Sequence, residues 1–286
     1  MMDNEVNRLN RAIEELRKIP EANWLTSLSD RKIKELEFHD RDRSGGFVDE
    51  TISNDTYEQF YGNRKYYSVT ARSKNFVKQW IEEESQGRIF LDYACGNGSN
   101  ALLAAKSGAV LSLGLDISPV SIENAKAIAL IEPGTVGPLE YFQADAENTR
   151  LPDNSVDRII CSGMLHHLDL SYAIPELRRI LKPGGKILAG EALDYNPLIK
   201  IYRKMTPDMR TEWEKAHILS LQDVHFISKF FEIEQIKYWH ILGIVAGKWP
   251  KLLPVLDRVD KFLEKIPFIQ RLSWIFTFVI VKPTSA

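Results

Sequence analysis

The chain has 286 residues and a formal net charge of −2, with 44% hydrophobic and 27% charged residues. These values are ordinary for a globular protein with a sizeable core, and the near-neutral charge excludes a general attraction to nucleic acid. Two cysteines, Cys95 and Cys161, exclude a disulfide framework and favour a reducing compartment, so we expect a cytoplasmic location.

The first 80 residues predict a helical extension. Residues 3–19 carry apolar side chains at helical spacing until Pro20, and the segment is too charged for a secretory signal. Residues 21–65 are polar with few periodic apolar positions, and residues 70–84 predict a second helix. We therefore expect a helical lid over 1–80 and the main domain over 81–286.

Strands and helices alternate from residue 88 onward. The pattern predicts strands at 88–92, 109–116, 139–144, 156–162 and 186–192, and helices at 99–106, 118–129 and 172–181. No run of apolar residues is long enough to span a membrane. Alternation of this kind predicts a mostly parallel sheet with helices on both faces.

The last third departs from this alternation. Residues 196–229 predict helices, and 231–246 and 274–282 predict two strands that pair antiparallel. The expected fold is α/β, with a Rossmann-like, seven-stranded, mostly parallel sheet and an antiparallel last strand. Insertions into this pattern are expected at 196–222 and 248–272.

A glycine-rich loop follows the first of these strands, in LDYACGNGSN (91–100). Residues 96–101 read G-x-G-x-x-A, and Asp116 lies 20 residues after Gly96, which is the spacing of a dinucleotide site. An NAD(P)-dependent oxidoreductase is therefore one alternative.

Acidic residues end three successive strands and favour a different ligand. Asp92 precedes the glycines, where its carboxylate would repel a pyrophosphate but attract an ammonium group. Asp116 suits ribose hydroxyls, and Asp145 can accept a hydrogen bond from an adenine amino group. A ligand with an ammonium, a ribose and an adenine but no phosphate is S-adenosylmethionine.

Four segments together resemble the class I S-adenosylmethionine-dependent methyltransferases. They are LDYACGNGSN, GLDISP, FQADAENTRLPDNSVDRIICSGMLHHL and LRRILKPGGKILAGE, and the resemblance covers residues 88–192. The subgroup includes quinone-biosynthesis enzymes and many small-molecule methyltransferases. The cofactor residues that this resemblance implies are Asp92, Ala94, Gly96, Asn97, Gly98, Asp116, Ile117, Asp145, Ala146 and Ser162.

Position 94 departs from the family, which usually has glycine there. Ala94 carries a methyl group, and we expect it to be tolerated only at a negative φ.

Three residues are candidates for catalysis. His166 and His167 follow the fourth strand, and an imidazole has a pKa suited to a base near neutral pH. Glu191 ends the fifth strand, at the edge where open α/β sheets bind ligands. Each of these three residues could instead have a purely structural role, as a helix cap, a packing residue or a member of a surface ion pair. The sequence predicts no metal site.

The residues before the glycine-rich loop resemble a lid that folds over the cofactor in this family. His39, Asp40 and the tyrosines Tyr57, Tyr61, Tyr66 and Tyr67 are candidates for it. Residues 251–266 predict an amphipathic helix. Three roles are open for it: packing on the sheet, covering a hydrophobic acceptor, or contacting a membrane. Its mixed charge counts against the membrane interpretation.

We therefore expect methyl transfer to a small-molecule acceptor, with oxygen favoured over nitrogen or carbon. The resemblance implies that the insertions at 196–222 and 248–272 lie on the acceptor side, where Arg203, Arg210 and His217 are candidates for binding an acidic group of that acceptor. No nucleic-acid partner is expected, and the oligomeric state stays open. A non-catalytic, methyltransferase-like partner subunit is the other alternative.

Overall fold

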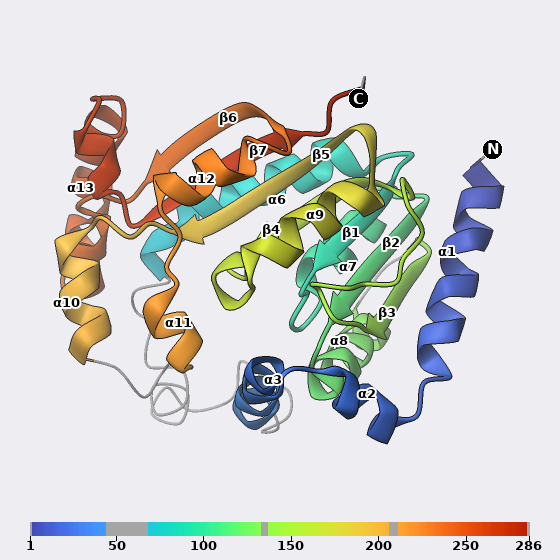
Figure 1. Ribbon diagram of the computed structural model, residues 1–286. Helices are drawn as coiled ribbons and strands as arrows, with labels where there is room; N and C mark the ends of the chain where they lie inside the picture. The colour runs from blue at the N-terminus through green and yellow to red at the C-terminus, as the bar shows by residue number, and fades with distance from the viewer. Residues whose placement is uncertain (1, 44–67, 133–136, 206–210, 285–286) are drawn as a thin grey trace.

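The computed structural model is a single seven-stranded sheet with helices on both faces (Figure 1). It describes residues 2–43, 68–132, 137–205 and 211–284. The strands are β1 (Ile89–Tyr93), β2 (Leu111–Asp116), β3 (Leu139–Gln143), β4 (Val156–Ser162), β5 (Leu181–Ala192), β6 (Glu232–Trp239) and β7 (Ile275–Val281).

The strand order is β3-β2-β1-β4-β5-β7-β6, and only β7 runs against the others. The predicted parallel sheet and antiparallel ending are confirmed. The strand predicted over 231–246 is too long, because His240 turns to a positive φ of 64° and Gly243–Gly247 forms a short 3-10 helix.

The helices flank this sheet. They are α1 (Met2–Arg17), α2 (Glu21–Ser27), α3 (Asp30–Arg43), α6 (Ala71–Ser85), α7 (Ser99–Lys106), α8 (Pro119–Ile131), α9 (Leu170–Ile180), α10 (Pro197–Met205), α11 (Glu212–Ala216), α12 (Leu221–Ile227) and α13 (Leu253–Leu263). Short 3-10 turns are η1 (Ser68–Thr70), η2 (Leu165–His167), η4 (Gly243–Gly247), η5 (Pro250–Leu252) and η6 (Ile269–Leu272). Helices α2 and α3 arise where the sequence lacks apolar periodicity.

Alternating residues of β1 divide the core between the two faces of the sheet. Ile89, Leu91 and Tyr93 pack in one cluster with residues of α1, α9 and α12. Phe90 packs on the opposite face with Trp80 of α6 and residues of α7. This alternation follows from the period of two in a strand, and it buries β1 completely.

Helix α3 lies across the end of the sheet at which β1, β2 and β3 terminate (Figure 1). Helix α1, by contrast, contributes Leu9, Ile13 and Leu16 to the main core. The division of the chain at residue 80 stays a prediction. Within the described ranges, no helix has both the length and the apolar composition to cross a bilayer.

Candidate active site

The loop after β1 turns through three left-handed residues. Ala94, Gly96 and Gly98 have φ values of 56°, 54° and 75°. A β-carbon on Gly98 would lie 2.4 Å from the Tyr141 ring, so only glycine fits there. The expectation that Ala94 needs a negative φ is wrong, and its left-handed backbone carries a local strain of about 1–2 kcal/mol.

Asp92 is buried beneath this loop. Its carboxylate accepts hydrogen bonds from the Ala101 amide (3.3 Å) and the Asn100 side chain (3.4 Å), which fixes the start of α7. Burial raises the pKa of Asp92 to about 7. The side chain is 1% exposed and lines neither of the two cavities described below.

Asp116 ends β2 and holds the loop in place. Its two oxygens accept hydrogen bonds from the amides of Gly96 (2.8 Å) and Ser118 (2.9 Å). The Arg43 guanidinium of α3 lies 3.7 Å from the same carboxylate. A carboxylate with two oxygens has about four acceptor positions, so Asp116 retains capacity for hydroxyl donors.

Asp145 follows β3 and is held by α3. One oxygen accepts a hydrogen bond from the Glu147 amide (2.9 Å), and the other lies 2.6 Å from the Lys32 ammonium. Burial alone would lower the pKa of Lys32, but hydrogen bonds to Asp145 and Glu147 raise it. Lys32 is therefore a cation that covers Asp145.

A smaller cavity of about 180 Å³ lies between α3 and the ends of β1, β2, β3 and β4. Seven of the ten predicted cofactor residues line it: Ala94, Gly96, Asp116, Ile117, Asp145, Ala146 and Ser162. Asp92, Asn97 and Gly98 do not.

A larger cavity of about 720 Å³ adjoins the smaller one. All three predicted catalytic residues, His166, His167 and Glu191, line it, together with Arg203 of α10. Five residues line both cavities: His39, Arg43, Ser162, Gly163 and His167. The two cavities therefore meet just beyond the end of β4.

Glu191 and His166 form a buried pair in the wall of the larger cavity. Glu191 accepts hydrogen bonds from the amides of Met164 (2.8 Å) and Leu165 (2.7 Å), and its second oxygen lies 2.7 Å from His166 Nδ1. Glu214 lies 3.9 Å from His166 Nε2. Burial opposes a charged imidazole, but Glu191 and Glu214 outweigh it and raise the pKa of His166.

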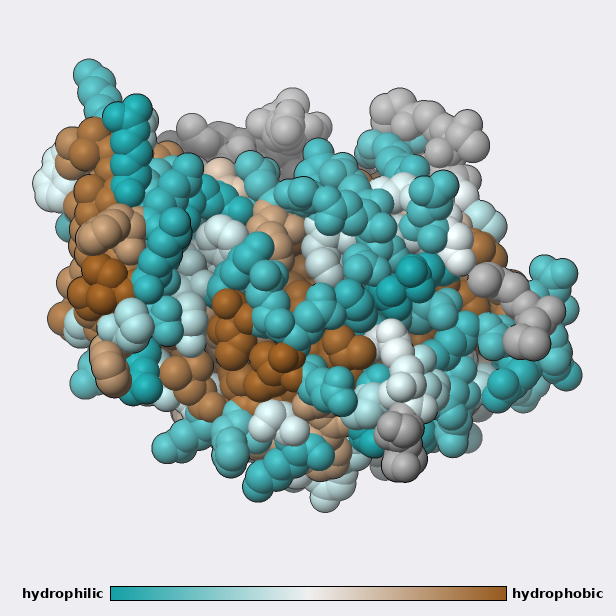
Figure 2. Space-filling model, turned by 90° about the horizontal axis from the view of Figure 1, so that it is seen from above, coloured by the Kyte–Doolittle hydropathy of each residue, from teal (hydrophilic) through white to brown (hydrophobic). Residues whose placement is uncertain are grey.

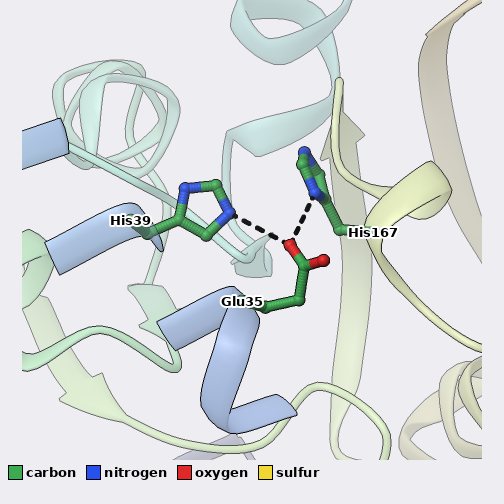
Figure 3. A group of neighbouring side chains, drawn as sticks. All are labelled: Glu35, His39 and His167. Carbon is green, nitrogen blue, oxygen red and sulfur yellow. Dashed lines mark hydrogen bonds and ion pairs between the residues drawn. The ribbon is translucent and has the colours of Figure 1, made fainter. Parts of the chain in front are cut away.

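His167 faces α3 instead, as Figure 3 shows. Its Nδ1 lies 3.0 Å from Glu35, and His39 Nε2 lies 3.8 Å from the same oxygen. The three donor atoms lie within 4.8 Å of one another, so the expectation that no metal binds stays a prediction. Burial and the Arg43 charge lower the pKa of His39 well below the ordinary value.

The sequence did not indicate most of the α3 contribution. Arg31, Lys32, Glu35 and Arg43 line the smaller cavity beside His39, which is one of the predicted lid candidates. Asp40 accepts a hydrogen bond from Ser118, and the tyrosines 57, 61, 66 and 67 lie outside the described residues, as does Arg210. His217 stacks on Trp213 away from both cavities.

The same central region matches a known family. Residues 91–189 match the family model described as "Methyltransferase domain". The mitochondrial ubiquinone biosynthesis O-methyltransferase of Schizosaccharomyces pombe is 26% identical over 61% of this chain and 62% of its own length. A ubiquinone/menaquinone biosynthesis C-methyltransferase of Psychromonas ingrahamii is 33% identical over 41% of this chain.

The chain spans 62% and 48% of the lengths of those two relatives. Magnesium protoporphyrin IX methyltransferase of Synechocystis shares the fold, with a TM-score of 0.56 and 16% identity over 88% of this chain and 99% of that structure. The predicted resemblance to class I S-adenosylmethionine-dependent methyltransferases, and the fold it implies, are confirmed.

Proposed function

We propose that this chain, whose residues 91–189 carry a methyltransferase domain, transfers a methyl group from S-adenosylmethionine to an oxygen of a small-molecule acceptor. The observation that supports this most strongly is the meeting of the two cavities at Ser162, Gly163 and His167. A cofactor in the smaller cavity and an acceptor in the larger one would adjoin at these residues, as direct displacement requires.

The residues of the smaller cavity fit the cofactor chemically. Asp116 has acceptor capacity for ribose hydroxyls, Asp145 for the adenine amino group, and Ile117 offers an apolar contact for the adenine. The match of residues 91–189 to a methyltransferase domain counts against the oxidoreductase alternative. At about 180 Å³ the cavity is below the range of about 300–1,000 Å³ typical of ligand sites, so we expect α3 to shift during binding.

The cofactor, when bound, supplies a methyl group on a sulfonium, which is already a good leaving group. The chain positions the acceptor, excludes water and removes a proton from it. His166 Nε2 is the proposed base, because Glu191 holds Nδ1–H and leaves Nε2 to accept the proton. Arg203 and Glu214 of the same wall would orient the acceptor.

By their printed names, two of the proteins named above are methyltransferases of quinone biosynthesis, and the third methylates magnesium protoporphyrin IX. They support a cyclic, largely apolar acceptor that carries a hydroxyl group. Among oxygen, nitrogen and carbon, oxygen is proposed because a phenolic hydroxyl is a strong nucleophile once a base such as the Glu191–His166 pair takes its proton.

A transfer assay tests this function. The purified chain is incubated with methyl-labelled S-adenosylmethionine and a panel of phenolic, catecholic and amine acceptors. We expect label in phenolic or catecholic products, and a His166→Gln variant that loses about 10²–10⁴-fold in kcat. His217→Gln, outside both cavities, is the matched control.

Two outcomes would contradict the proposal. Cofactor binding without turnover on any acceptor would favour the partner-subunit alternative. The second is label that enters amine acceptors at the same rate in the wild type and in His166→Gln. That result would contradict both transfer to oxygen and the role of His166 as the base.

A further inference from the structure

Helix α13 exposes an apolar stripe that nothing in the described chain covers. Leu252, Val255, Val259 and Phe262 follow one another at spacings of three, four and three, so they share one face. Their exposed fractions are 44%, 57%, 39% and 67%. Trp249, Phe268 and Leu272 continue the exposed apolar surface on the flanking turns.

Helix α10 repeats the arrangement. Leu198, Ile201 and Met205 recur at spacings of three and four and are 48%, 56% and 76% exposed. The Asn196 side chain, just before α10, donates a 2.6 Å hydrogen bond to the Leu272 carbonyl of η6, which joins the two segments. We call these exposed residues of α10, η5, α13 and η6, together with Trp249 and Phe268, the apolar edge.

In residues 248–272 the cationic side chains face the solvent and the acidic side chains face the protein interior. Residues 248–272 contain six cations, Lys248, Lys251, Arg258, Lys261, Lys265 and Arg271, and all six are exposed. The three acids of this segment face inward. Asp260 is fully buried and accepts hydrogen bonds from the Leu242 and Gly243 amides.

The other two acids of this segment, Asp257 of α13 and Glu264 just after it, lie against a cation of the protein itself. Glu264 pairs with Arg72 of α6 and accepts a hydrogen bond from the His240 amide. Asp257 lies 3.9 Å from the same Arg72. The sequence of this segment has mixed charge, which counted against a membrane contact. In the structure, however, the cations form an exposed stripe and the acids lie on the internal side.

Figure 2 shows this edge of the molecule, where hydrophobic residues lie among hydrophilic ones over α13. We propose that the apolar edge and its cations dock the protein on the surface of an anionic lipid bilayer. A contiguous exposed apolar surface can mark a contact with a membrane, and an apolar stripe beside a basic one is the pattern of helices that lie in a membrane interface. The six outward cations match anionic headgroups.

The apolar edge lies next to the larger cavity. Ile199 and Arg203 line that cavity from the inner face of α10, while the exposed stripe occupies the outer face of the same helix. Docking would bring the cavity close to the bilayer, so the acceptor would be a lipid-soluble molecule. This last step rests on the proposed function, whereas docking itself does not.

Vesicle sedimentation tests the docking without any turnover. Vesicles of phosphatidylcholine and phosphatidylglycerol in equal amounts are compared with phosphatidylcholine alone. We expect binding to the anionic vesicles, weakened by salt, and little binding to the neutral ones. Trp249 fluorescence should shift to the blue on binding, and the Trp249→Phe variant should lack that change.

A matched pair of double variants identifies the surface. Val255→Ser with Phe262→Ser should weaken vesicle binding by at least about tenfold, because both side chains would lie in the interface. Leu130→Ser with Ile131→Ser removes even more exposed apolar groups from α8 and should leave binding within about twofold.

Three results would overturn the proposal. They are no binding to anionic vesicles, equal losses in the two double variants, and a dimer in vesicle-free solution that only the Val255/Phe262 variant converts to a monomer. The last result would assign the apolar edge to a second copy of the chain. If docking holds but no methyl transfer is detected, only the proposed function fails.

Discussion

At the scale of single residues, the glycine-rich loop owes its shape to packing as much as to ligand contact. Gly98 combines a φ of 75° with a β-carbon position 2.4 Å from the Tyr141 ring, and the Tyr141 hydroxyl donates a 2.6 Å hydrogen bond to the Gly98 carbonyl. Gly98 is therefore held by the ring of β3, although the sequence motif implies a cofactor residue.

Replacing Gly98 by alanine should lower the free energy of unfolding by about 3 kcal/mol, from left-handed strain and overpacking together. Gly87→Ala is the matched control, because Gly87 has a φ of 69° with nothing within 4 Å of its β-carbon position. Its loss should be about 1 kcal/mol. Urea unfolding measures both, and equal losses would show that Tyr141 does not set the constraint.

The Glu191–His166 pair predicts how activity depends on pH. A base acts only while neutral, so kcat/KM should rise with pH through the pKa of His166 and fall away below it. Because Glu191 and Glu214 raise that pKa, the acid limb should lie above the ordinary value of 6.5.

Glu191→Gln should move this limb to lower pH, since the neighbouring charge is gone while burial still disfavours the imidazolium. Glu214→Gln should move it less, because Glu214 lies farther from the ring. A pH–rate profile of each variant decides the matter. If the acid limb of the pH–rate profile does not move in Glu191→Gln, His166 is not the base whose protonation controls the rate.

At the scale of elements, α3 closes the smaller cavity by ion pairs. Arg31 pairs with Glu147 and donates to the His167 carbonyl (2.9 Å), and its guanidinium lies 4.7 Å from the Trp213 ring of α11. Lys32 covers Asp145 and Arg43 approaches Asp116. The cations of α3 thus hold the carboxylates that the cofactor would need.

Weakening this closure at Arg31 should speed cofactor entry. Arg31→Met removes contacts to Glu147 and His167 but leaves Asp116 and Asp145 untouched, so S-adenosylhomocysteine should associate several-fold faster. Stopped-flow tryptophan fluorescence measures the rate. Arg17→Met, which breaks an exposed pair with Glu140, is the control, and an unchanged rate in Arg31→Met would show that α3 does not limit entry.

The sequence did not predict α3, because the residues of this helix contact residues that are distant in the chain and show little apolar periodicity of their own. Ile33 and Leu36 are too few for a helical pattern, and Lys32 meets Asp145 across more than a hundred residues. Buried strands such as β1 were predictable, since a continuous apolar run and a glycine-rich turn leave few other arrangements. The direction of the Asp92 side chain depends on α7 and was not predictable.

At the scale of the whole molecule, the smaller cavity, the larger cavity and the apolar edge lie one after another in space. The ends of β1 to β4 line the smaller cavity, and the residues at the end of β4 form its boundary with the larger one. The end of β5 and the inner face of α10 line the larger cavity, and the outer face of α10 belongs to the exposed edge. The parallel sheet predicts the first of these, because the carboxyl ends of its strands share one edge. The sequence alone does not show which way the α13 acids face.

Calorimetric titration of the purified chain with S-adenosylhomocysteine and, separately, with NAD tests the central claim most directly. The account predicts binding of the nucleoside without a pyrophosphate. Binding should weaken at least about tenfold in Asp145→Ala and stay unchanged in Asp153→Ala, a carboxylate paired with Arg179 outside both cavities. Binding of NAD in preference to S-adenosylhomocysteine would contradict the account.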